Sequence, residues 1–155
     1  MIKNIIRGFI VLCAIGAACS LPKKAYKQYL PVTLFSTACQ LVEILYFTLH
    51  KLWKVKGGPK SAMCHASILV VGPYFFSNLW AFHLSKGKFV RYFFINLIAD
   101  LIYAFPVVNL FSKLNFFKLK VSSKQFFSLI FTNALLNYGF QKFYEKFSVP
   151  SRARE

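Results

Sequence analysis

The sequence predicts an all-α integral membrane protein, a single domain over residues 1–155 folded as a bundle of five transmembrane helices. Two observations carry this prediction. First, 57% of the residues are hydrophobic and only 15% are charged, too few to cover the surface of a soluble domain of this length. Second, the apolar residues are gathered into runs of about 20, the length that crosses a bilayer, and short basic segments separate the runs.

The charges are almost all positive, with 20 Lys and Arg against 4 Asp and Glu. A net charge of +16 would ordinarily indicate nucleic-acid binding. Here the basic residues stand between apolar runs, where a membrane protein contacts lipid head groups. We therefore expect the lipid bilayer as partner, and no nucleic acid.

The first run, residues 5–21, follows Lys3 and has the basic start and small-residue end of a secretory signal peptide. An uncleaved first span is favoured because further spans follow, and cleavage would leave four. Ala14 and Ala17 would allow close packing against a neighbouring helix.

The second run, residues 29–50, follows a short basic turn and places Pro31 in its first helical turn, where a missing N–H costs least. Gln40 and Glu43 are three residues apart, so they share a helix face. They form a second polar site, in the other half of the membrane from the main cluster described below.

Residues 51–60 are expected to form a basic loop that turns at Gly57-Gly58-Pro59. Lysines flank a tryptophan here, an arrangement typical of the membrane interface. Generic anchoring is favoured over recognition of a specific anionic lipid. The candidate interfacial anchors are Lys51, Trp53, Lys54 and Lys56.

The third run, residues 62–84, contains Gly72-Pro73, which should kink the helix by freeing a backbone carbonyl near Leu69. Such breaks can build ion or substrate sites, but ordinary helix packing is the favoured interpretation. A tight turn, Ser-Lys-Gly-Lys, then leads into the fourth run.

The fourth run, residues 89–112, carries a carboxylate, Asp100, near its middle, and a charge there costs on the order of 3 kcal/mol. Asn96 and Tyr103 lie on the same helix face as Asp100. Pro106 should bend the helix beyond this polar stripe.

Residues 113–124 alternate lysines with apolar residues and could lie in the membrane interface as an amphipathic connection. The last run, residues 125–144, carries Asn133 and Asn137 one helical turn apart. The tail, residues 145–155, is expected to be loosely ordered.

Depths estimated from the helical rise bring six polar residues of three spans to compatible levels. This candidate intramembrane cluster comprises Asp100, Asn96, Tyr103, Asn78, Asn133 and Asn137. It could hold the helices in register through hydrogen bonds, or it could be part of a proton or cation path. The structural interpretation is favoured because the chain has few acids and no complementary intramembrane base.

No catalytic motif, metal site or cofactor site is expected. There is no phosphate-binding loop, no nucleophile motif and no pair of carboxylates at a useful spacing. The cysteines, Cys13, Cys19, Cys39 and Cys64, lack metal-ligand spacing and are interpreted as apolar fillers of helix interfaces. Lys and Arg are equally numerous on the two sides of a five-span topology, so the positive-inside rule predicts no orientation.

Four stretches, residues 29–37, 53–60, 72–89 and 96–119, are similar to a family of small multi-pass membrane proteins of Bacillus and related spore-forming Firmicutes. The similarity covers roughly residues 21 to 141. It implies a bacterial plasma-membrane location and a bundle of four or five helices, and it supplies no activity.

The leading hypothesis is a non-enzymatic, multi-pass membrane protein that acts by associating with anionic lipid, with another membrane protein or with further copies of itself. The alternative is a small transporter, or an ion- or proton-conducting component, centred on Asp100.

Overall fold

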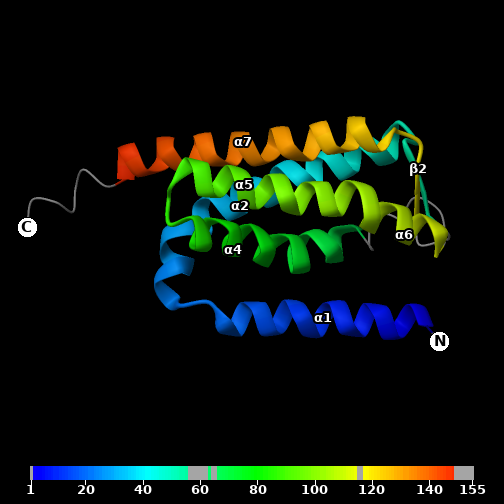
Figure 1. Cartoon of the computed structure of the whole chain (residues 1–155), viewed down its shortest axis with the longest axis horizontal. Helices are drawn as coiled ribbons and strands as arrows, with labels where there is room; N and C mark the ends of the chain where they lie inside the picture. Colours follow the sequence, from blue (N-terminus) through cyan, green and yellow to red (C-terminus); the bar gives the residue numbers. More distant parts are fainter. Residues whose placement is uncertain (1, 56–62, 64–65, 115–116, 149–155) are drawn as a thin grey trace, which may run out of the picture.

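The protein is mostly helical, and its helices lie side by side in a bundle (Figure 1). The structure is a computed structural model that describes residues 2–55, 63, 66–114 and 117–148. Its helical elements are α1 (Ile2–Ser20), α2 (Lys23–Leu49), η1 (Val70–Tyr74), α4 (Phe75–Ser85), α5 (Phe89–Ile102), η2 (Tyr103–Val107), α6 (Val108–Lys113) and α7 (Ser123–Ser148).

Three helices are long and apolar enough to cross a membrane. They are Lys23–Leu49, Ala66–Ser85 and Phe89–Lys113, which correspond to the second, third and fourth predicted runs. Within the described residues, α1 and α7 do not meet the same criterion of length and composition. The structure therefore supports a helical membrane protein with three candidate spans.

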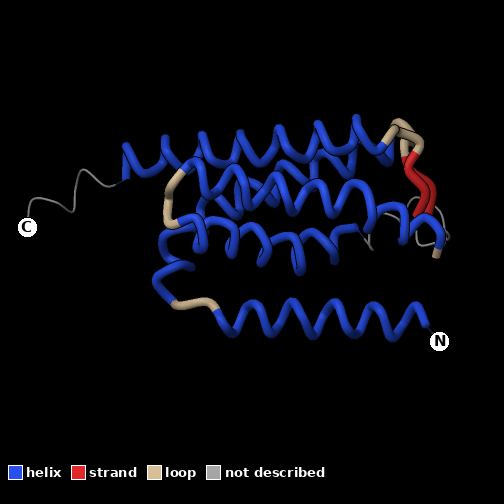
Figure 2. The backbone as a smooth tube through the Cα atoms, in the orientation of Figure 1, coloured by secondary structure: helices blue, strands red, loops and turns tan. Residues whose placement is uncertain are grey.

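The all-α prediction needs one correction, at the end of the bundle where α2 stops. Strand β1 (Trp53–Val55) pairs antiparallel with β2 (Phe117–Leu119), and Lys54 lies opposite Lys118. Figure 2 shows the two strands in red at this end of the bundle. Both strands fall in segments predicted as a basic loop and an interfacial connection. The alternation of lysine and apolar residues has the two-residue period of a strand, which sends Lys118 outward and turns Phe117 and Leu119 toward the bundle. We call this the sheet end.

The opposite end, which we call the turn end, contains the predicted tight reversal between α4 and α5. Lys86 and Gly87 adopt left-handed conformations with φ of 49° and 72°, and the Lys88 N–H donates to the Ser85 carbonyl at 3.0 Å. The reversal makes α4 and α5 antiparallel neighbours. The start of α2 and the end of α7 lie at this same end of the bundle (Figure 1).

Helix α2 begins earlier than the sequence predicted, and this changes the place of Pro31. The residues interpreted as a basic turn are helical from Lys23, with Pro22 as the N-cap. Pro31 therefore lies inside the helix and not in its first turn. It removes one backbone hydrogen bond of α2, the bond to the carbonyl four residues earlier.

The other two intrahelical prolines each lie in a π-helical turn. Pro73 is in η1 and Pro106 is in η2, so both predicted disturbances coincide with a change of helical winding. A π turn widens the helix locally, and such turns are frequent at functional sites. η1 also carries Tyr74, a side chain that becomes important below.

The main hydrophobic core cluster lies among α2, α4 and α5. Phe82 is fully buried between two aromatic rings, with centroids 5.6 Å from Tyr29 and 4.5 Å from Tyr92. Leu79 and Val32 are fully buried in the same cluster. These contacts fix the helices that carry the polar residues of the interior.

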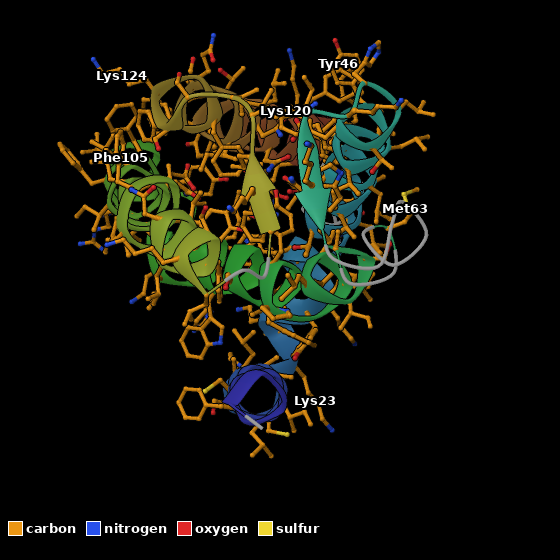
Figure 3. All side chains as sticks on the ribbon, turned by 90° about the vertical axis from the view of Figure 1, so that its right-hand side faces the viewer. Lys23, Tyr46, Met63, Phe105, Lys120 and Lys124 are labelled. Carbon is orange, nitrogen blue, oxygen red and sulfur yellow. The ribbon has the colours of Figure 1, made fainter. Side chains whose placement is uncertain are left out.

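Helix α1 stands apart from the other helices, as the end-on view in Figure 3 shows. Its large side chains Phe9 and Leu12 are 68% and 69% exposed. Two hydrogen bonds tie its C-terminal part to the bundle: the Trp80 Nε1 donates to the Ala17 carbonyl at 3.0 Å, and the Tyr26 hydroxyl donates to the Ala18 carbonyl at 2.7 Å. α1 is thus attached at the turn end.

Candidate functional site

A line of polar side chains runs along the contact between α2 and α7, and we call it the polar file. On α7 its members recur every four residues, which places them on one face of the helix. On α2 the members follow the matching helical spacing. The polar file comprises Thr33, Ser36, Thr37, Gln40 and Glu43 of α2, and Asn133, Asn137, Gln141 and Glu145 of α7.

The two helices are antiparallel, so the polar file pairs early residues of one with late residues of the other. Glu43 accepts a hydrogen bond on Oε1 from the Asn133 Nδ2. Nearer the turn end, the Asn137 Nδ2 donates to the Ser36 Oγ at 2.7 Å. Both bonds join α2 to α7 between residues far apart in the sequence, and they fix the register of the pair.

Ser36 extends the polar file to a third helix. Its hydroxyl lies 2.7 Å from the Tyr74 hydroxyl on η1, while it also accepts from Asn137. A serine, an asparagine and a tyrosine therefore form a largely buried junction between the file and the helix Ala66–Ser85, which contains Pro73.

The file ends in charged residues at the turn end. The Gln141 Nε2 donates to the Glu145 Oε1 at 2.9 Å, and the Lys142 Nζ lies 3.0 Å from the Glu145 Oε2. Gln141 is 1% exposed, whereas Lys142 is exposed. The file thus leads from a surface ion pair into the interior.

The structure divides the predicted cluster between two places. Asn133 and Asn137 belong to the polar file, but Asp100, Asn96 and Asn78 make no hydrogen bond across the bundle within the described residues. Asn96 donates to the Tyr92 carbonyl of its own helix at 2.9 Å. Asp100 Oδ2 and Asn78 Nδ2 are buried without a hydrogen-bond partner in the described part of the chain.

Tyr103, the remaining member, packs its ring on Phe126 with centroids 5.9 Å apart. Together with Gln40 and Glu43 it lines a cavity of about 130 Å³ at the sheet end. Tyr103 therefore lies closer to the second predicted acid than the sequence suggested. The polar residue that the sequence placed apart, Glu43, belongs to both the file and the cavity.

Of the predicted interfacial anchors, Lys51 and Lys54 are exposed at the sheet end. Trp53 instead turns inward: its Nε1 donates to the Thr48 Oγ1 at 3.0 Å, and its ring lines the cavity. Lys56 lies outside the described residues. The ring of Phe117, on the neighbouring strand, lies beside the Trp53 ring with centroids 6.5 Å apart, a contact that the sequence pattern of the loop alone does not show.

The sequence interpretation missed five members of the polar file and the tyrosine beside it: Thr33, Ser36, Thr37, Gln141, Glu145 and Tyr74. For Gln141 and Glu145 a signal existed, since the four-residue spacing of Asn133 and Asn137 continues through both. For Ser36 and Tyr74 no signal existed, because their hydrogen-bond partners lie on neighbouring helices. In the described residues no group of three His, Cys, Asp or Glu lies close enough to hold a metal ion.

No family model, curated protein or solved structure matches the chain. The similarity to membrane proteins of Bacillus and its relatives therefore stays a prediction.

Proposed function

We propose that the chain is a non-enzymatic, multi-pass protein of a bacterial plasma membrane that associates with anionic lipid at both ends of its bundle, with α1 and α7 added to the three candidate spans. The carrying observation is the distribution of exposed basic residues. At the turn end they are Lys23, Lys24, Lys27, Lys86, Lys88, Arg91, Lys142 and Lys146; at the sheet end they are Lys51, Lys54, Lys113, Lys118, Lys120 and Lys124.

Exposed apolar side chains separate the two basic bands. Phe94, Ile98 and Leu136, for example, are 54%, 57% and 57% exposed on α5 and α7. An apolar belt between two basic bands matches the hydrocarbon core and the two head-group layers of a bilayer. Each Lys or Arg near an anionic surface contributes about 1 kcal/mol of attraction.

Replacing Lys86 and Lys88 of the turn end by glutamine should weaken binding of phosphatidylglycerol by about thirtyfold, because two cation contacts of about 1 kcal/mol each are lost. The measurement is native mass spectrometry of the protein with phosphatidylglycerol and phosphatidylcholine. The matched control replaces both lysines by arginine, which keeps the charge and should keep the affinity. Equal binding of the two lipids by the unaltered protein would contradict the proposal.

The polar file supports a second candidate function, conduction or transport of a proton or cation. Its side chains form hydrogen-bonded pairs at three levels between the turn end and the sheet end: Gln141 with Glu145, Asn137 with Ser36, and Asn133 with Glu43. In this second candidate function the proton or cation path is centred on Glu43 and not on Asp100, since Glu43 is the acid that is hydrogen-bonded within the polar file. Ionisable groups inside a membrane commonly mark such paths.

Glu43→Gln should abolish proton flux into vesicles that hold the purified protein, because glutamine preserves the acceptor for Asn133 but cannot carry a proton. Asp100→Asn is the matched control and should keep the flux. The measurement is quenching of a pH-sensitive dye under an imposed potassium diffusion potential. Absence of flux in the unaltered protein would exclude this second function and leave the lipid proposal untouched.

A further inference from the structure

The cavity at the sheet end has aromatic walls and one carboxylate. It lies among α2, the Ala66–Ser85 helix, η2, α7 and the two strands, and its volume is about 130 Å³. Its other walls are aliphatic, and Gln40 and Glu43 supply its amide and its acid. The aromatic side chains that line it are Phe47, Trp53, Tyr103, Phe117 and Phe126.

One carboxylate oxygen of Glu43, a residue of the cavity wall, has no hydrogen-bond partner among the described residues. Oε1 accepts from Asn133, while Oε2 is buried and has no hydrogen-bond partner among the described residues. Trp53 does not fill this role, because its Nε1 already donates to Thr48. A buried carboxylate oxygen without a hydrogen-bond donor is energetically unfavourable, and a cationic donor forms the strongest hydrogen bond with it.

The chemistry of the cavity walls indicates which kind of cation would bind. The faces of aromatic rings attract ammonium groups, and aromatic cages are a recurrent way of binding organic ammonium ions. A hard metal ion such as Ca²⁺ or Mg²⁺ instead requires about six oxygen ligands, which an aromatic wall with one carboxylate and one amide does not supply. The lining therefore favours an organic ammonium ion with an apolar body.

The cavity also limits the size of the ligand. Its volume is close to that of an engineered protein cavity of about 150 Å³ that accommodates benzene. We propose that the cavity is a binding site for a small organic ammonium ion, whose cationic group pairs with Glu43 and whose apolar body contacts Trp53, Phe117 and Phe126. This site depends neither on lipid binding at the basic bands nor on conduction along the polar file.

Benzylammonium, benzyl alcohol and benzoate form a test series of one size and three charges. With the full chain in phosphatidylcholine nanodiscs, calorimetry should show saturable binding of benzylammonium at least about tenfold tighter than that of benzyl alcohol, and no binding of benzoate. Equal affinity for benzylammonium and benzyl alcohol would overturn the proposal and show an uncharged apolar cavity. This comparison needs no variant, so it stands even where a substitution prevents folding.

Two variants of cavity residues and one control variant locate the site. Glu43→Gln should lower the affinity for benzylammonium by about tenfold, to that of benzyl alcohol, whereas Asp100→Asn, the matched intramembrane acid, should leave it unchanged. Ala66→Leu adds carbon atoms to the cavity wall and should weaken both ligands together. Unchanged benzylammonium binding in Glu43→Gln would place the ligand elsewhere and overturn the proposal.

Trp53 provides a spectroscopic check, because Trp53 and Trp80 are the two tryptophans of the chain. In a Trp80→Phe background, benzylammonium should change the Trp53 fluorescence with the same saturation curve as the calorimetric signal. A saturating calorimetric signal without any change in Trp53 fluorescence would contradict the assigned cavity.

Discussion

Phe82→Ala is expected to lower the free energy of unfolding by about 3–5 kcal/mol, the largest effect we predict for a single substitution in this protein. Phe82 is fully buried and its ring packs between Tyr29 of α2 and Tyr92 of α5. Truncation would leave a void at the meeting point of three helices, and the remaining rings cannot close it without moving their backbones.

The measurement is unfolding in mixed micelles with increasing sodium dodecyl sulfate, followed by circular dichroism. Phe94→Ala is the matched control: Phe94 is 54% exposed on the α5 surface, so the same truncation should cost less than about 1 kcal/mol. Equal losses in the two variants would mean that Phe82 does not lie in the packed core.

Asn137→Leu and Asn78→Leu are expected to have opposite effects on stability. Asn137 is 3% exposed and donates to Ser36, so leucine would remove a bond between α2 and α7 and cost about 1 kcal/mol. Asn78 is 7% exposed, and its Nδ2 is buried without a partner among the described residues. Leucine there removes an unsatisfied donor, and the gain should be about 1 kcal/mol.

The same unfolding measurement compares the two variants, and each serves as the control for the other because the change in side-chain chemistry is identical. Destabilisation by Asn78→Leu equal to that of Asn137→Leu would mean that Asn78 has a hydrogen-bond partner in the membrane. Stabilisation by both would mean that the polar file does not hold α2 and α7 together.

The sequence indicated the helices well because their signals are local. Apolar runs of about 20 residues identify candidate spans without knowledge of their neighbours, and the structure has three helices of this kind where three of the runs were predicted. Proline effects are equally local, and both Pro73 and Pro106 coincide with π turns. The predicted start of α2 was wrong because Lys23 to Gln28 are helical although three of these six residues are lysines.

The strands were missed because each is short and is recognisable as a strand only from its hydrogen bonds to the other. Trp53–Val55 and Phe117–Leu119 are three residues each, and the helices Ala66–Ser85 and Phe89–Lys113 separate them in the sequence. A three-residue stretch alone cannot be told from a loop by its period. The inward position of Trp53, and with it one wall of the cavity, follows from this pairing.

The sequence by itself determined the class of the protein and the face on which each polar residue lies, because composition and helical period depend on the chain alone. Tertiary structure decided which faces meet. Asp100, the costliest residue to place by sequence, makes no bond across the bundle in the described part of the chain, whereas Glu43 bonds Asn133 and lines the cavity. The physical reason is that helix rotation and register arise from packing among several helices, and no single segment encodes them.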